Sequence, residues 1–176
     1  MPATEKKSYT VGDINSLSCE DFVAFIGPAF EHSPWIAEAC WLRRPFNSLE
    51  HLHQALCEGI RTSPLARQVE FIRAHPDLVG RAALAGTLTQ ASTSAQASAG
   101  LNKLSAEEIA LFENFSQSYR EKFGFPFVIC ARMNKKEAIL NGFRVRLQHS
   151  REKEMETALV EIEKIAYLRL QDIIES

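Results

Sequence analysis

The sequence has few of the features that mark membrane, secreted or organelle-targeted proteins. Its longest apolar run is far shorter than the roughly 18 residues that a membrane-spanning helix needs. Residues 1–10 are polar and lack the apolar core of a secretory signal peptide. The terminal residues, which end in Glu175 and Ser176, do not form a peroxisomal tripeptide. We therefore expect a cytoplasmic protein.

An excess of charge of one sign is also missing. The 20 lysines and arginines face 22 aspartates and glutamates, which gives a formal net charge of −2. Proteins that bind nucleic acids or anionic membranes usually carry a concentrated basic patch. The balance of charge predicts neither nucleic acid nor membrane as a partner.

Cysteine and metal-ligand patterns are sparse. The four cysteines are Cys19, Cys40, Cys57 and Cys130. No two of them form a CxxC pair and each has apolar neighbours, so we expect reduced core residues. His51 and His53 lie two residues apart, whereas ligands on one helix face lie three or four apart. The sequence predicts no metal site, and it contains no phosphate-binding glycine motif or nucleophile elbow.

What is present is enough apolar material for one core. The chain has 176 residues, of which 45% are hydrophobic, and 11 of them are phenylalanines. A chain of this length typically forms a single domain. We divide it into an N-terminal tail, residues 1–13, and one domain, residues 14–176.

Helix signals recur along that domain. Serine and asparagine can accept hydrogen bonds from the first-turn amides of a helix, and proline is tolerated in that turn. The expected helix starts are Ser18, Ser33-Pro34, Ser48, Pro64, Ser105, Asn134 and Ser150. Ser105 and Glu108 fit a capping box, and Gly124 should end that helix. Residues 125–131 are predicted to form a short buried extended segment. With almost no strand signal, the fold class is all-α, a compact single-domain bundle of roughly eight helices.

Residues 82–100 are rich in alanine, serine, threonine and glycine. Such a composition is typical of a flexible linker. A run of small residues also allows the backbone to approach a ligand or another helix closely. Composition alone leaves both interpretations open.

Arg169 has an unusual place in the last predicted helix. At about 100° per residue it falls near the middle of an apolar stripe. The stripe consists of Met155, Leu159, Ile162, Ala166 and Ile173. A buried unpaired charge costs several kcal/mol, so the guanidinium must have a partner. Either it forms an ion pair with a core-edge carboxylate or reaches the surface, or it lines a polar pocket and binds a carboxylate or imide oxygen.

His75 is the second candidate for chemistry. It precedes Pro76, which disfavours helical geometry at the histidine and places it at a helix end. The helix dipole there favours the imidazolium, which suits a general acid near neutral pH. The alternative is that His75 merely ends one helix while Asp77 caps the next.

Four segments of the chain, taken together, resemble the signature stretches of one family. They are FEHSPWI at residues 30–36, AHPDL at 74–78, FGFPFVICAR at 123–132 and IAYLRL at 165–170. In this order they are similar to the 2-oxo-4-hydroxy-4-carboxy-5-ureidoimidazoline (OHCU) decarboxylases of urate breakdown, over roughly residues 14–174. The resemblance implies an all-α, usually dimeric enzyme without a cofactor, which converts OHCU to (S)-allantoin.

The resemblance also assigns site residues. The family's catalytic histidine matches His75, and its C-terminal active-site arginine matches Arg169. Substrate contacts are implied for Pro76 and for residues 127–131, partly through backbone groups. These five residues are Phe127, Val128, Ile129, Cys130 and Ala131.

Position 95 departs from the family pattern. Residues 88–101 keep Ser92 and Gln96, which the resemblance places at the substrate, but Ala95 stands where the family has an active-site glutamate. A glutamate there would bind the hydroxyl or ureido groups of the substrate, and alanine cannot. A second hypothesis is therefore a catalytically impaired or non-catalytic homologue that binds a related ureide. A helical protein-interaction module is a third, but it gives His75 and Arg169 no role.

Overall fold

The structure is a computed structural model that describes residues 8–79 and 88–175. Within these residues it has nine α-helices and two short 3₁₀ helices, and the only β-pairing is an isolated bridge between Tyr9 and Ile174. The all-α prediction is confirmed. The chain divides into two compact units: the first takes in the chain up to Pro64 together with residues from Ala166 onward, and the second is Leu65–Ile165.

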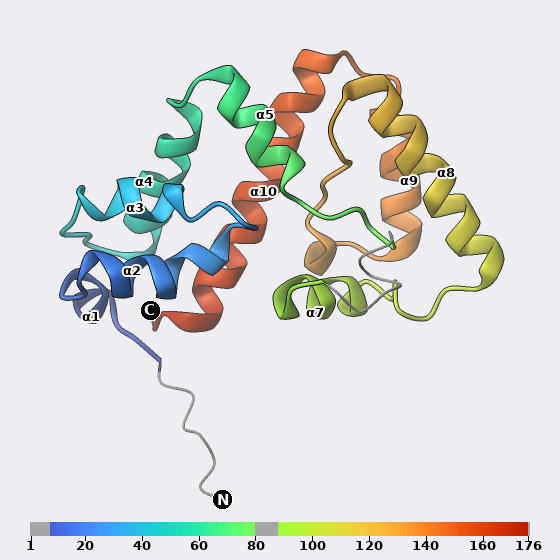
Figure 1. Cartoon of the computed structure of the whole chain (residues 1–176). Coiled ribbons are helices and arrows are strands. Elements are labelled where there is room, and N and C mark those ends of the chain that lie inside the picture. The colour runs from blue at the N-terminus through green and yellow to red at the C-terminus, as the bar shows by residue number, and fades with distance from the viewer. Residues whose placement is uncertain (1–7, 80–87, 176) are drawn as a thin grey trace, which may run out of the picture. The chain divides into compact units, whose positions relative to one another are not determined.

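The first unit is built mainly from helices in the N-terminal part of the chain (Figure 1). They are α1 (Val11–Asn15), α2 (Cys19–Ile26), η1 (Gly27–Ala29), α3 (Trp35–Trp41) and α4 (Leu49–Arg61). Ser18 accepts a hydrogen bond from the amide of Asp21, and Ser48 accepts one from the amide of His51, as predicted for N-caps. The α4 stripe is buried: Leu49, Leu52, Leu56 and Ile60.

The start of α3 differs from the prediction in detail. Pro34 is the N-cap of this helix and not its first residue. The Ser33 hydroxyl caps nothing, because it donates to the carbonyl oxygen of Glu31 at 3.0 Å. That bond supports the turn at His32, whose φ of 48° lies in the left-handed region.

Residues 8–13 of the predicted tail are among those described. The amide of Glu175 donates to the carbonyl of Tyr9 at 2.8 Å, and the amide of Tyr9 donates to the carbonyl of Ile173 at 3.3 Å. The helix α1 begins at Val11, with Thr10 and Asp13 forming a capping box. Ordered backbone therefore begins before residue 14.

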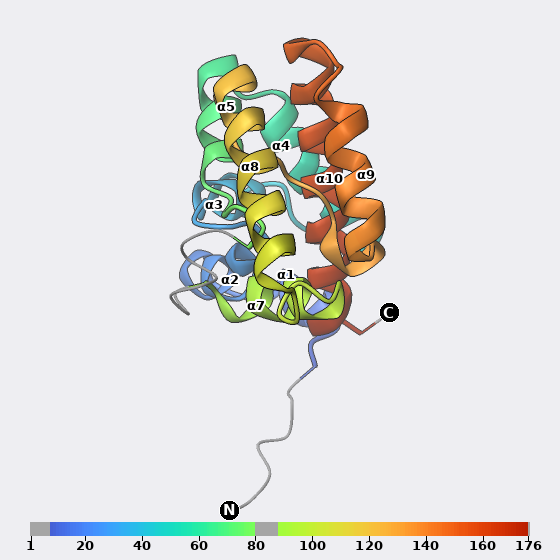
Figure 2. The same ribbon diagram turned by 90° about the vertical axis from the view of Figure 1, so that its right-hand side faces the viewer.

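The second unit contains α5 (Leu65–Arg73), α7 (Gln90–Ser98), α8 (Ala106–Phe123), η2 (Ala131–Met133) and α9 (Lys136–Arg146). It also takes the first part of α10 (Arg151–Ile173), as far as Ile165. The helix α8 has the predicted capping box and ends at Gly124, whose φ of 79° explains the glycine. It lies alongside α9, as Figure 2 shows.

One predicted cap is wrong. Asn134 does not cap α9, because Lys135 occupies the N-cap position without a side-chain hydrogen bond. The Asn134 side chain instead donates to the carbonyl of Cys130 at 2.9 Å. The side chain thus serves the turn that precedes it, and asparagine favours such local bonds as readily as helix caps.

Aromatic rings fill the core of the second unit. Phe127 and Phe143 stack with their ring centroids 3.8 Å apart, and Tyr119 meets Phe127 edge-on at 5.3 Å. The predicted segment 125–131 is buried throughout and, up to Cys130, lies outside the helices. It runs through this aromatic core, so large side chains surround its backbone.

The structure describes part of the small-residue segment, residues 82–100. Residues 82–87 lie outside the described residues, but Gln90–Ser98 form α7, with the Thr89 hydroxyl as N-cap. A helix at residues 90–98 favours the close-packing interpretation over a flexible linker, and this helix packs against η2. In the part of the chain that the structure describes, no helix is long and apolar enough to cross a membrane.

Candidate active site

His75 lies just beyond the C-terminal end of α5, as predicted. It is 6% exposed, and its backbone amide donates to the carbonyl of Ile72 at 3.1 Å. Its Nδ1 lies 3.1 Å from the carbonyl oxygen of Phe71, whose ring meets the imidazole edge-on. A carbonyl can only accept a hydrogen bond, so Nδ1 carries a proton.

Gln96 holds the segment that follows His75. Its Oε1 accepts from the amide of Val79 at 3.1 Å, and its Nε2 donates to the carbonyl of Asp77 at 3.4 Å. The φ of Val79 is 56°, which is costly for a β-branched residue and must be compensated by such bonds. The predicted site residues His75 and Gln96 are thus linked through residues 77–79.

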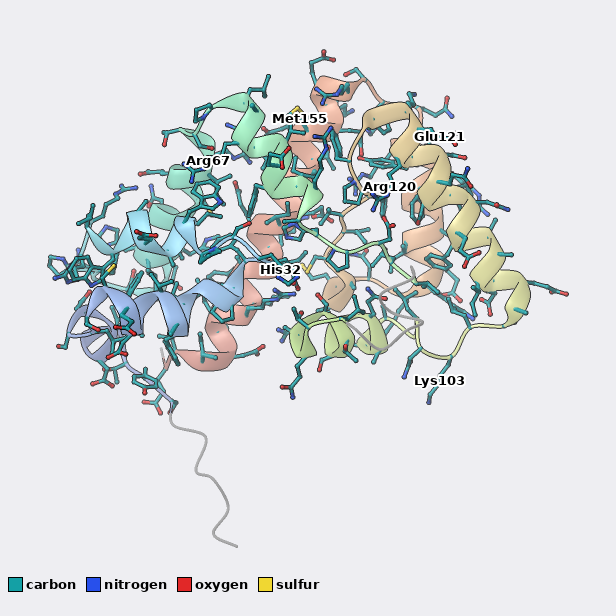
Figure 3. All side chains as sticks on the ribbon, viewed as in Figure 1. His32, Arg67, Lys103, Arg120, Glu121 and Met155 are labelled. Carbon is teal, nitrogen blue, oxygen red and sulfur yellow. The ribbon has the colours of Figure 1, made fainter. Side chains whose placement is uncertain are left out.

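Asp77 has a structural partner of its own. Its Oδ2 lies 2.8 Å from Nη2 of Arg120, a residue of α8 that is labelled in Figure 3. The alternative role of Asp77, as cap of a following helix, concerns residues 80–87 and lies outside the described residues. Pro76, between His75 and Asp77, is partly exposed.

Ser92 and Ala95 lie on α7 with Gln96. Ser92 and Gln96 are buried and one helical turn apart, whereas Ala95 is partly exposed. The backbone carbonyl of Ala95 accepts from the amide of Ala99, so position 95 has ordinary helical geometry. A longer side chain at this position would not have to displace the core.

The second unit also contains the five predicted residues of segment 127–131, all of them buried. The carbonyl of Val128 accepts from Nη1 of Arg146 at 2.7 Å, and that of Cys130 accepts from Asn134. Among the described residues, the amides of Ile129 and Cys130 have no acceptor. Burial raises the pKa of the Cys130 thiol above its ordinary value, so this cysteine stays protonated near neutral pH.

Arg169 belongs to the first unit. Its side chain is 12% exposed and pairs through Nη2 with Oε1 of Glu31 at 2.9 Å; Nη1 donates to the carbonyl of Pro28 at 3.2 Å. The ion pair with a core-edge carboxylate, one of the predicted alternatives, is therefore present. In the predicted stripe, Ile173 is partly exposed and the other four residues are buried: Met155, Leu159, Ile162 and Ala166.

Glu31 is a residue that the sequence analysis did not single out. Its side chain is only 2% exposed, and its second oxygen, Oε2, lies 3.8 Å from Nε2 of the exposed His32, labelled in Figure 3. The sequence offered one signal, a glutamate inside the FEHSPWI segment. Its partner Arg169 lies 138 residues away along the chain.

No metal-binding group was expected from the sequence. In residues 8–79 and 88–175, no three histidine, cysteine, aspartate or glutamate side chains come together in a way that could hold a metal ion.

Comparison with known proteins gives the family. The model of the OHCU decarboxylase family matches residues 15–171 of the chain. The chain belongs to the OHCU decarboxylase family. OHCU decarboxylases similar to it include one from Amia calva, 44% identical over 92% of this chain and 93% of that protein, and one from Xenopus laevis, 40% identical over 91% of each.

Two solved structures are also similar. An (S)-allantoin synthase matches with a TM-score of 0.78 and 27% identity over 96% of this chain, which spans 54% of that longer chain. An OHCU decarboxylase crystallised in the presence of (S)-allantoin matches with a TM-score of 0.67 over 87% of this chain and 96% of that one; at 21% identity it supports the fold alone. The all-α fold described above is thus the fold of the family.

Proposed function

We propose that this protein is a carboxy-lyase that decarboxylates OHCU to (S)-allantoin in urate breakdown, without a metal or an organic cofactor. Membership of the OHCU decarboxylase family supports the reaction class. The observation on which the proposal mainly depends is His75. It is a buried histidine at a helix end, and its Nδ1 is tied to a backbone carbonyl.

Loss of CO₂ from OHCU leaves an electron pair on C4, the ring carbon that carries the hydroxyl and adjoins the C5 imine, so the pair is delocalised through the imine toward the C2 carbonyl oxygen. C5 then takes up one proton, and the C4 hydroxyl becomes a carbonyl as its own proton passes to N1. The protein has to orient the carboxylate out of the ring plane, stabilise the developing oxyanion and deliver one proton to one face. His75 donates that proton from Nε2 as an imidazolium and becomes neutral; solvent then restores the proton. The helix end favours the imidazolium that this step needs.

Arg169 is the proposed anion-binding group. Glu31 and the carbonyl of Pro28 fix the plane of its guanidinium. A fixed plane is what recognition of a carboxylate or imide by paired N–H groups requires. The backbone amides of Ile129 and Cys130 are the proposed donors to ring oxygens, with Phe127, Val128 and Ala131 shaping the same segment. Pro76, Ser92 and Gln96 complete the proposed substrate contacts.

A second candidate function follows from Ala95. Its methyl group cannot replace the carboxylate that the family resemblance predicts at this position. Residue 95 is partly exposed and carries no charge. A chain that binds a ureide but turns over OHCU slowly is therefore the competing proposal. Both proposals predict that the protein binds a ureide, but they predict different rates of OHCU turnover.

The test is to follow circular dichroism of freshly prepared OHCU with and without the protein. The proposed function predicts optically active allantoin at a rate well above the spontaneous, non-stereospecific reaction. A rate equal to the spontaneous one, together with measurable binding of (S)-allantoin, would favour the ureide-binding homologue. Denatured protein at the same concentration is the control for adventitious catalysis.

A homodimeric state is a further proposal, which rests on the family resemblance. A cytoplasmic location is another, which follows the expectation drawn from the sequence. Sedimentation equilibrium at several protein concentrations tests the dimer. Fractionation of cells that express the full chain tests the location.

A further inference from the structure

Segment 127–131 has an unusual backbone environment, because up to Cys130 it belongs to no helix or strand. Regular structure normally fixes the direction of each backbone amide through a ladder of hydrogen bonds. Here two side chains do this at alternate peptides. Arg146 binds the carbonyl of Val128 at 2.7 Å, and Asn134 binds the carbonyl of Cys130 at 2.9 Å.

Several contacts hold the Arg146 side chain in place. Its side chain is 7% exposed, and its Nε donates at 2.7 Å to Oε1 of Glu154, whose side chain is fully buried. The same oxygen accepts from the Tyr119 hydroxyl at 2.6 Å, and the other carboxylate oxygen accepts from His149 Nδ1 at 2.9 Å. The guanidinium also lies over the Phe127 ring, 4.1 Å from its centroid.

Stability alone does not explain this arrangement. A buried ion pair is often no more stabilising than apolar side chains of the same volume, because removing both charges from water costs about as much as their attraction returns. What an apolar pair cannot do is hold the Val128 carbonyl. That carbonyl and the Ile129 N–H belong to one planar trans peptide, so they point in opposite directions. Fixing the carbonyl toward Arg146 fixes the Ile129 N–H away from it.

We propose that Arg146 is a positioning residue for the reaction: by binding the Val128 carbonyl, it aims the Ile129 N–H at the oxyanion that develops in the substrate. The inference rests on the proposed function, because that function supplies the oxyanion. Glu154 and Tyr119 act through Arg146 by holding its guanidinium plane. An amide that is fixed before the reaction needs no reorganisation as charge develops, which is the condition for strong electrostatic stabilisation.

The first test is Arg146→Met, which keeps the length and removes the donors. Removing one oxyanion donor typically lowers kcat by about 10²–10³, so a misdirected donor should lower kcat by about tenfold or more. KM should change far less, because the oxyanion exists only in the transition state. Arg146→Lys should restore part of kcat, since an ammonium can still donate to one carbonyl.

The matched control is Arg144→Met, which removes an exposed guanidinium from the same helix, one that lies over the Phe115 ring, without touching the Val128 carbonyl. It should keep kcat near the wild-type value. If Arg146→Met does not fold, the double variant Arg146→Met/Glu154→Leu replaces it, since removing both charges together avoids an unpaired buried carboxylate. A folded variant of either kind with wild-type kcat overturns the proposal.

A second measurement separates this inference from the proposed function. The amide resonance of Ile129 is followed by NMR while (S)-allantoin is added. We expect it to shift in the wild-type protein and in Arg144→Met, and to respond much less in Arg146→Met. Such a response in a protein without turnover would show that Arg146 directs the Ile129 amide and that the proposed decarboxylation is wrong. Normal turnover, with an Ile129 amide resonance that does not shift when (S)-allantoin is added, would support decarboxylation and refute the positioning role.

Discussion

Arg169 donates from Nη2 to Oε1 of Glu31 at 2.9 Å, and the glutamate side chain is 2% exposed. The sequence alone leaves open whether this arginine forms an ion pair or binds a ligand. The pair with Glu31 does not exclude the second role, because a guanidinium has five N–H donors. Glu31 changes the expected consequences of substitution, since a buried carboxylate now depends on Arg169.

Arg169→Met should weaken binding of (S)-allantoin and also destabilise the protein. From the apolar stripe alone, the substitution would cost little stability, but it removes the guanidinium that pairs with the buried Glu31 carboxylate. Breaking a buried pair in this way typically costs about 3–5 kcal/mol. Urea unfolding and calorimetric titration measure the two effects separately.

The matched variant is Arg169→Met/Glu31→Leu, which removes the pair together. It should recover most of the lost stability but none of the lost affinity. If the double variant also bound (S)-allantoin normally, Arg169 would be a structural residue only.

His75→Ala should abolish catalysis and leave the protein folded. Removal of a general acid typically lowers the rate by about 10²–10⁴. The imidazole makes a local bond to the Phe71 carbonyl, so its loss should affect α5 only near its end. Turnover of OHCU and thermal unfolding are measured on the same preparation. Wild-type turnover in a folded variant would assign the proton donor to another group.

Gln96→Leu should lower both stability and kcat. The substitution keeps the volume but leaves the Val79 amide without its acceptor, which typically costs about 1–3 kcal/mol. Only Pro76 separates residues 77–79 from His75, so their release should also disturb the imidazole. Gln90→Leu, an exposed glutamine on the same helix, is the control. A stability loss with unchanged kcat would show that residues 77–79 do not position His75.

Much of the local structure could be predicted because its causes are local. Ser18, Ser48 and Ser105 cap helices since each hydroxyl meets an amide three residues further on. Gly124 ends α8 because its φ is positive. Asn134 was misassigned because an asparagine side chain can serve the turn before it as well as the helix after it, and only the position of the Cys130 carbonyl decides.

The partners in the site could not be predicted, because they are distant in sequence. A helical periodicity showed that Arg169 lies on an apolar face, but nothing in it indicates Glu31 as the partner. The network of Arg146, Glu154 and Tyr119 was missed for the same reason: Arg146 and Glu154 resemble ordinary polar positions of a surface helix, and Tyr119 resembles an apolar core position. Only packing reveals that Arg146 reaches the Val128 carbonyl.

Alkaline pH should destabilise the protein through Cys40. Burial raises the pKa of this thiol from 9.0 to about 12 in the folded state. Between these two values the unfolded chain loses the proton and the folded chain keeps it, so the free energy of unfolding falls as pH rises, by up to about 1.4 kcal/mol per pH unit. Below pH 9 the thiol is protonated in both states and contributes no slope. Urea unfolding from pH 8 to 11 should show a shallower decline in Cys40→Ala, and equal slopes would contradict the prediction.

Position 95 offers the most direct test of whether this chain has lost activity relative to its family. Ala95 has ordinary helical geometry on α7 and is partly exposed, between the buried Ser92 and Gln96. Glutamate is a good helix former, so Ala95→Glu should not distort the backbone or the core. Position 95 can therefore accept a glutamate.

Ala95→Glu should raise the rate of stereospecific allantoin formation by about tenfold or more. The estimate corresponds to one restored charge-assisted contact of about 1.5–3 kcal/mol, and about 1.4 kcal/mol changes a rate tenfold. Ala95→Gln is the matched control, because it has the same size and can hydrogen-bond but carries no charge. If glutamate and glutamine raise the rate equally, the contact does not depend on charge. Equal rates for all three proteins, well above the spontaneous one, would show that the glutamate is dispensable here. Equal rates at the spontaneous level would mean that other parts of the site have changed too, and the ureide-binding proposal would then take precedence.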